Sequence, residues 1–152
     1  MEKTEQTDAF WESKNLIRDP ANSFYSVRRI GGNNKTVDII LELIKTRQKT
    51  GTFGLKWLQD IKKQPAFEVG QYSVLVDMNH HPDALIRTTE INTINYCDIS
   101  VDHLLIEGPN ARTLDIWQDI HWPFWTDLLE QANLVPSLAM PIVVEKFELV
   151  AL

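Results

Sequence analysis

The segment Lys49-Thr50-Gly51-Thr52 combines the residue types of an anion-binding or hydrolytic site. A lysine amine binds anions when charged and accepts a proton when neutral, a state that burial or a nearby cation favours. The threonine hydroxyls are nucleophiles, and the glycine lets a substrate approach the backbone closely. An ordinary lysine at the end of a helix remains the simpler interpretation of the spacing alone.

Aromatic residues gather around His121. Trp117 lies four residues before it, on the same face of a predicted helix, and Trp122, Phe124 and Trp125 follow closely. The simplest interpretation of this group is a hydrophobic core. The alternative is a platform on which nucleic-acid bases stack, at about 1–3 kcal/mol per base.

Neither the paired histidines nor the single cysteine suggests a metal or cofactor site. His80 and His81 are adjacent, so their side chains point apart, and they precede Pro82 in a predicted turn. Cys97 alone excludes an internal disulfide and a cysteine-based zinc cluster. The sequence has no glycine-rich phosphate loop, no HExxH motif and no nucleophile-elbow motif. We therefore predict neither a metal nor a cofactor.

Charge is distributed unevenly along the chain. The 152 residues include 15 Lys+Arg and 21 Asp+Glu, for a net charge of −6. Residues 28–63 hold nine bases and three acids, net +6, which leaves −12 for the rest. A basic segment in an acidic protein is a candidate anion site or, alternatively, a solvated helix face. Residues 64–152, with 3 bases and 13 acids, would repel a long polyanion, so we expect a nucleoside or a short single-stranded RNA as partner.

A predicted helix directly before Lys49 must position it. The apolar residues of 37–44 follow the spacing of one buried face, after a cap at Asn34 or Thr36. The remaining patterns predict strands at 51–53, 72–78, 84–91, 91–96 and 140–150, and helices at 101–106, 113–121 and 124–132, the last two separated at Pro123. Because strands and helices do not alternate as βαβ units, we predict an α+β fold, a small barrel with helices around it.

The N-terminal residues are polar. We expect a frayed tail over 1–9 and a first packing segment formed by Phe10, Trp11, Leu16 and Ile17. The sequence shows no secretion signal and no apolar run near the 18 or so residues that a membrane helix needs. The predicted location is therefore cytoplasmic, without a membrane partner, and the oligomeric state stays open.

Six motifs, in order along the chain, resemble those of the ASCH domain family, which has a PUA-like β-barrel fold. They are Lys49-Thr50-x-Thr52, Phe67-Glu-Val-Gly-Gln, Val74-Leu-Val-Asp with Leu85-Ile-Arg-Thr-Thr-Glu-Ile, Glu107-Gly108, Trp117-x-x-x-His121-x-x-Phe124-Trp125 and Met140-Pro-Ile-Val-Val-Glu-Lys-Phe-Glu. The chain is similar to a longer bacterial subfamily. The resemblance implies an α+β fold with a small mixed β-barrel surrounded by helices. It also implies an N-terminal extension over residues 1–27 that packs on an ASCH domain over residues 28–152.

The resemblance suggests two classes of function. ASCH domains are described as RNA binders, and some members hydrolyse acylated cytidine nucleosides or have been linked to RNA cleavage. The lysine, threonine and glutamate of the amidohydrolases fall here on Lys49, Thr52 and Glu107. We expect substrate contacts at Arg47, Thr50, Gly51, Arg87, Trp117 and His121. The alternative is a non-catalytic module that binds RNA or a nucleotide, with Lys49 and Glu107 as an ion pair.

The hydrolase interpretation assigns a role to each of the three residues. Thr52 Oγ attacks the amide carbonyl, Lys49 accepts its proton, and Glu107 orients the amine or activates water. The sequence departs from the family pattern at Arg47 and Gln48, where a glycine and a lysine are expected. The turn before the lysine must therefore form without that glycine.

Overall fold

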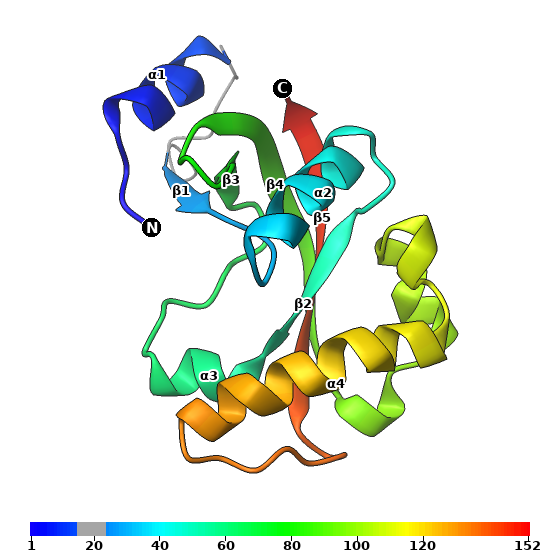
Figure 1. Cartoon of the computed structure of the whole chain (residues 1–152). Coiled ribbons are helices and arrows are strands. Elements are labelled where there is room, and N and C mark those ends of the chain that lie inside the picture. The colour runs from blue at the N-terminus through cyan, green and yellow to red at the C-terminus, as the bar shows by residue number, and fades with distance from the viewer. Residues whose placement is uncertain (15–23) are drawn as a thin grey trace.

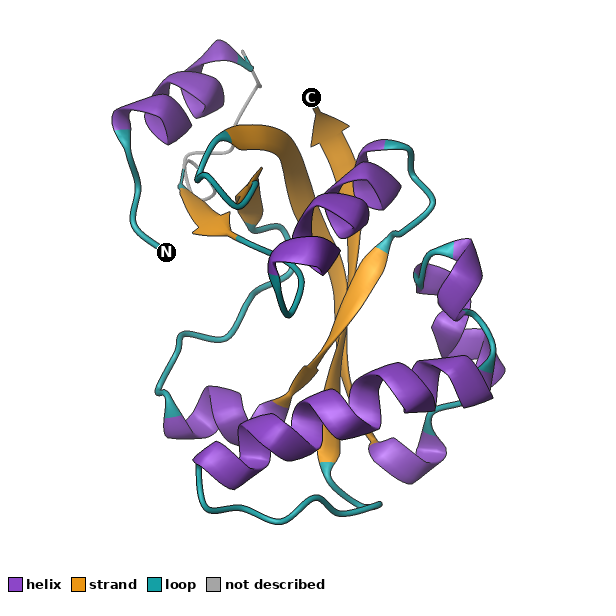
Figure 2. Ribbon diagram, viewed as in Figure 1, coloured by secondary structure: helices purple, strands orange, loops and turns teal. Residues whose placement is uncertain are grey.

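The computed structural model describes residues 1–14 and 24–152, and its centre is a five-stranded sheet (Figure 1, Figure 2). The strands are β1 Tyr25–Arg28, β2 Gly51–Leu55, β3 Tyr72–Val76, β4 Pro82–Asn95 and β5 Pro141–Ala151. Their order across the sheet is β1-β3-β4-β5-β2. β1 and β3 are parallel, and the other neighbours are antiparallel. The predicted α+β class is confirmed.

The sheet is open, with β1 and β2 as its two edges, so the predicted closed barrel is wrong. β1 has four residues and pairs with β3. It ends at Arg28, before the chain turns toward α2, and is too short to reach across to β2. A side-chain contact connects the two halves instead, because Arg28 forms an ion pair with Glu145 of β5.

Helices flank the long ribbon of β4 and β5. They are α1 Glu5–Ser13, α2 Asn34–Lys45, α3 Lys56–Ile61 and α4 Leu114–Gln131, with the 3-10 helices η2 Tyr96–Asp98, η3 Val101–Ile106 and η4 Pro109–Ala111. In Figure 1, α2 lies beside the upper part of the sheet, and α3 and α4 lie near its lower end. α4 continues through Pro123, where two helices were predicted. Trp117, Trp125 and Leu129 all dock on one core, which keeps both halves in line despite the missing proline N–H.

α2 confirms the helix predicted before Lys49. Its cap is Asn33, one residue before the expected Asn34, because the Asn33 side chain accepts hydrogen bonds from the backbone of Lys35 and Thr36, at 3.0 and 3.2 Å. The buried face consists of Val37, Leu41 and Ile44. This face packs on apolar side chains of β3, β4 and β5, which fixes where the end of the helix lies.

The turn from α2 into β2 determines how Lys49 leaves the helix. Arg47 adopts a left-handed φ of 61°, at a cost of roughly 1–2 kcal/mol, so the turn forms without the glycine of the family pattern. The backbone N–H of Lys49 donates to the carbonyl of Leu43 at 3.0 Å. Gly51 must be a glycine, because an added Cβ would lie 2.4 Å from the carbonyl oxygen of Glu145.

The N-terminal segment forms a helix, so the predicted frayed tail is wrong. Thr4 and Thr7 cap the start of α1 reciprocally, at 2.8 and 3.2 Å. Trp11 is buried against tyrosine rings of β1 and β3, with ring centroids 5.1 and 5.3 Å away. Leu16 and Ile17, expected to pack with it, lie outside the described residues. Among the described residues, every helix is too short or too polar to cross a membrane.

The hairpin predicted around Pro82 is confirmed, and its second strand is longer than expected. β4 runs for 14 residues where two strands were predicted. The pairing register with β5 shifts between Thr88 and Glu90, an irregularity that bends a strand without ending it. η3 confirms the short helix at 101–106, capped by Ser100, although its geometry is 3-10. α3 lies where no helix was predicted.

Candidate functional site

A cavity of about 440 Å³, which we call the central cleft, lies between α2, β2, α4 and the loop after η3. Its apolar lining consists of Ile30, Ile39, Ile40, Leu43, Phe53, Ala111, Ile120, Phe124 and Trp125. Phe124 of α4 packs directly over Gly32, where an added Cβ would lie 2.7 Å from the ring. The volume falls within the range of pockets that hold small organic ligands.

Lys49 and Glu107 form a buried ion pair in the lining of the central cleft. Lys49 Nζ lies 2.7 Å from Glu107 Oε2, and the two residues are 5% and 7% exposed. Among the described lining residues, the charged side chains are these two, joined by the titratable His121. The polar part of the cleft therefore carries two opposite charges that balance one another.

Arg112 holds together the two segments that supply this pair. Its Nε donates to the carbonyl of Glu107 at 2.8 Å, and its Nη2 donates to the carbonyl of Gln48 at 2.9 Å. The backbone N–H of Thr50 also donates to the carbonyl of Ile106, at 2.8 Å. These contacts fix the backbone on both sides of the Lys49–Glu107 contact.

His121 of α4 lines the same cleft. Its Nδ1 lies 2.8 Å from the carbonyl oxygen of Trp117, and its Nε2 lies 4.0 Å from Glu107 Oε1. The ring stacks on Trp117 with centroids 4.5 Å apart. Burial lowers the pKa of His121, and nearby Lys49 acts in the same direction. The Trp117 carbonyl and Glu107 oppose this shift without reversing it, so the imidazole is neutral at pH 7.

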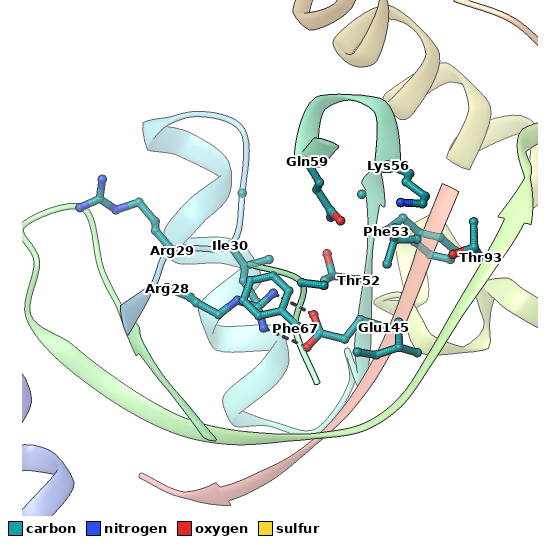
Figure 3. Close-up of a pocket in the computed structure, with 15 residues that line it drawn as sticks. Arg28, Arg29, Ile30, Thr52, Phe53, Lys56, Gln59, Phe67, Thr93 and Glu145 are labelled. Atoms are coloured by element: carbon teal, nitrogen blue, oxygen red, sulfur yellow. Dashed lines mark hydrogen bonds and ion pairs between the residues drawn. The ribbon is translucent and has the colours of Figure 1, made fainter. Parts of the chain in front are cut away.

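A second cavity of about 300 Å³, which we call the edge cavity, lies at the open side of the sheet (Figure 3). Arg28 crosses this opening and donates to both oxygens of Glu145, at 2.9 and 2.8 Å. Thr88 Oγ1 donates to the same carboxylate at 2.7 Å, and the Arg28 guanidinium stacks over Phe67 at 3.8 Å. This network braces the gap between β1 and the β4–β5 ribbon.

Thr52 lines both cavities. It pairs with Glu145 across the β2–β5 ladder, so the two side chains share a face of the sheet. Figure 3 shows its hydroxyl directed toward Gln59 rather than toward the Arg28–Glu145 pair. The structure therefore brings Lys49, Glu107 and Thr52 to one cleft, with Thr52 at the boundary between the two cavities.

Of the six expected substrate contacts, only His121 lines the central cleft. Arg47 is exposed and donates to the carbonyl of Leu149, and Thr50 is exposed on the turn. Arg87 lies on β4, 3.4 Å from Glu148. The remaining two are buried in packing roles, Gly51 against β5 and Trp117 at 0% exposure in the core.

The basic segment is partly neutralised within the fold. Four of its nine bases lie in ion pairs with acids: Arg28, Lys45, Lys49 and Lys56. Two of the four, Arg28 and Lys49, have side chains no more than 11% exposed. These two charges serve internal contacts and do not extend a basic surface for a long polyanion.

Three residues that shape the two cavities were not predicted as site residues. Arg112 acts through backbone carbonyls, which carry no sequence signature, and Arg28 pairs with Glu145 across 117 residues. A charged residue between the apolar positions of the last strand was the available signal for Glu145. Within residues 1–14 and 24–152, no group of three or more His, Cys, Asp or Glu side chains is arranged to hold a metal ion.

Comparisons with known proteins agree with this architecture. The sequence model of the ASCH domain matches residues 28–151. The structure is similar to that of an ASCH domain from Lactobacillus crispatus JV V101, with a TM-score of 0.90, 20% identity and coverage of 98% of this chain and 96% of that chain. It is also similar to protein EF3133 from Enterococcus faecalis V583, with a TM-score of 0.79, 25% identity and coverage of 95% and 85%. No curated protein matches the chain.

The family match includes the structural parts that form both cavities. It begins at Arg28, the residue that spans the edge cavity, and continues through α2, β2, α4 and all of β5. α1 lies before the matched range and packs against β1 and β3 through Trp11. The chain belongs to the ASCH domain family.

Proposed function

We propose that the central cleft binds a nucleoside, free or at the end of a short single-stranded RNA, and hydrolyses an acyl amide on its base. The observation that carries the proposal is the buried Lys49–Glu107 pair in the lining of a largely apolar cleft. Buried charges are costly to maintain, so a buried ion pair in the lining of a cleft is a candidate functional group. Acylated cytidine is the specific candidate substrate, as the family resemblance implies.

The lining favours an uncharged aromatic ligand. ASCH domains are generally considered RNA-binding, and bases are the apolar, stackable parts of RNA. Phe124 and Ile120 supply apolar contacts, while the opposite charges of Lys49 and Glu107 cancel. A cleft with no net positive charge gains little from a phosphate, so a nucleoside suits it better than a polyanion.

The proposed chemistry assigns one task to each polar group. The Thr52 hydroxyl is the nucleophile that attacks the acyl carbon. A proton transfer from Lys49 to Glu107 across their 2.7 Å contact produces the neutral amine that accepts the hydroxyl proton. The same amine then returns that proton to the leaving nitrogen of the base. Glu107 also accepts a hydrogen bond from that nitrogen and so orients the ligand.

Hydrolysis of N4-acetylcytidine tests the proposal. Purified protein should release cytidine and acetate, measured by chromatography, and Lys49→Met and Glu107→Gln should each reduce kcat/KM by at least about 100-fold. Lys45→Met and Glu148→Gln are matched controls, because both residues lie outside the cleft in more exposed ion pairs. An inactive wild type, or full activity in Lys49→Met, contradicts the hydrolase.

A binding-only function is favoured by the positions of two side chains. Lys49 Nζ is engaged by Glu107, and the Thr52 hydroxyl points toward Gln59 in the edge cavity. In that case the cleft recognises a nucleoside without cutting it. Cytidine should then quench the tryptophan fluorescence of the protein with an affinity that hardly changes with salt. A steep loss of affinity with salt indicates a phosphate track instead.

A further inference from the structure

The hydrogen bonds of His121 determine which of its ring nitrogens carries the proton. Nδ1 lies 2.8 Å from the carbonyl oxygen of Trp117, and a carbonyl oxygen can only accept. Nδ1 must therefore be the N–H. A neutral imidazole has one N–H, so Nε2 presents a lone pair. Stacking on Trp117, at 4.5 Å between centroids, holds the ring in this orientation.

The lone pair of Nε2 faces a second acceptor. Glu107 Oε1 lies 4.0 Å away, while the other carboxylate oxygen of Glu107 accepts from Lys49 Nζ at 2.7 Å. Two acceptors do not hydrogen-bond to each other, and these two lie 4.0 Å apart. A group with two hydrogens fits between them, because two hydrogen bonds of about 2.8 Å from one oxygen span roughly this distance. Water has this geometry.

The electrostatic surroundings keep His121 a base rather than a cation. Desolvation lowers its pKa, and the charge of Lys49 acts in the same direction. Glu107 and the Trp117 carbonyl favour the protonated form, but Glu107 is already balanced by Lys49. These are the charged and carbonyl groups that act on the ring, and together they leave the imidazole neutral and able to accept a proton.

We infer that His121 Nε2 and Glu107 Oε1 together hold the hydrolytic water, and that His121 is the general base that activates it. This inference rests on the hydrolase proposed above, and it adds a catalytic residue to it. Glu107 Oε1, the oxygen that Lys49 does not occupy, holds the water after the nucleoside has left. The water-activating base is therefore separate from the residue that serves the threonine.

The step is a simple hydrolytic displacement. The water oxygen forms a bond to the acyl carbon of the ligand as one water proton passes to His121 Nε2. The bond from the acyl carbon to Thr52 Oγ then breaks, and this oxygen takes the proton back from Nε2. The products are a carboxylic acid and the free hydroxyl, and His121 returns to its neutral form.

Two variants of His121 test this role by kinetics. His121→Gln keeps an acceptor oxygen but not a base, and His121→Phe keeps the stacking on Trp117 but no acceptor. Both should reduce kcat for N4-acetylcytidine by about 100-fold to 10,000-fold. In His121→Gln, kcat/KM should stay nearly unchanged, because it reports the attack of Thr52, which His121 does not serve, so KM should fall together with kcat. His81→Gln is the matched control, because His81 is an exposed histidine in the β3–β4 turn. The kcat of the wild type should fall as pH drops below 6.5, as the base takes up a proton.

The outcomes separate this inference from the proposal beneath it. An active wild type with an equally active His121→Phe overturns the role of His121 and leaves the hydrolase standing. An inactive wild type removes both. Nitrogen NMR of the imidazole rings adds a readout without turnover: Nδ1 should be protonated and Nε2 bare at pH 7. A proton on Nε2 at that pH overturns the inference, whatever the kinetics show.

Discussion

The Lys49–Glu107 pair makes a quantitative prediction about stability. Lys49→Met removes the ammonium group and leaves the Glu107 carboxylate, 7% exposed, without the donor that lies 2.7 Å from it. Removing one partner of a buried ion pair costs about 3–5 kcal/mol, because the remaining charge stays desolvated. Glu107→Leu should cost a similar amount, because it leaves the Lys49 ammonium buried without its partner.

The double variant separates this electrostatic cost from a loss of packing. Lys49→Met with Glu107→Leu replaces both charges by apolar groups of similar size, beside the apolar wall of the central cleft. Such replacements are often neutral or stabilising, so the double variant should lose no more than about 2 kcal/mol. The two single variants together should lose about 6–10 kcal/mol. The coupling energy between the two positions is then at least about 4 kcal/mol.

Urea unfolding followed by tryptophan fluorescence measures all four proteins of this cycle. Lys45 and Asp83 form the matched control pair, because they make a 2.9 Å contact with side chains 23% and 41% exposed. Their coupling should stay below about 1 kcal/mol. Single-variant costs at Lys49 and Glu107 that add within about 0.5 kcal/mol would refute the reasoning, since additivity means that the two charges do not depend on each other.

Three further predictions concern single positions. Arg47→Gly should raise the free energy of unfolding by about 1 kcal/mol, because glycine adopts a φ of 61° without strain. Arg47→Ala keeps the strain and should not raise the free energy of unfolding. The midpoints of urea unfolding measure both variants. Trp117→Phe should cost less than about 2 kcal/mol in the same assay, because the buried indole N–H has no partner among the described residues, whereas Trp117→Ala should cost about 3–5 kcal/mol. Because burial lowers the pKa of His121 in the folded protein, the unfolded chain binds that proton first as pH falls. The free energy of unfolding that neutral His121 contributes is therefore fully present above pH 6.5 and decreases below it, by at most about 1.4 kcal/mol per pH unit. Urea unfolding at pH 7.5 and 5.5 measures this decrease, and His121→Gln should lack it.

Local patterns predicted the elements better than their assembly. The spacing of Val37, Leu41 and Ile44 predicts α2 because a helix of that length needs only one buried face. Pro123 suggested a break in α4, which tertiary packing of Trp117 and Trp125 overrides. Whether the sheet closes depends on the length of β1. Long-range packing sets that length, and no short stretch of sequence contains this information.

The candidate site was predictable only in part. Lys49 and Glu107 are 58 residues apart, so only the family resemblance could bring them together. The tautomer of His121 depends on a backbone carbonyl of its own helix, which the sequence does not reveal. The carboxylate that faces its other nitrogen belongs to Glu107, on the loop directly after η3. Trp117 shares its helix face with His121, yet one is core and the other lines the cleft. Sequence spacing places both on that face but does not tell how deep each one lies.

The position of β5 has a consequence for how the protein is made. This strand is the last of the domain to leave the ribosome, yet it lies between β4 and β2 in the sheet. Its Phe147 backbone N–H donates to the carbonyl of Thr50, so the turn that carries Lys49 gains this contact only after β5 has been made. Until then, β2 and β4 both present unpaired backbone edges, which makes nascent chains prone to aggregation and candidates for chaperone binding.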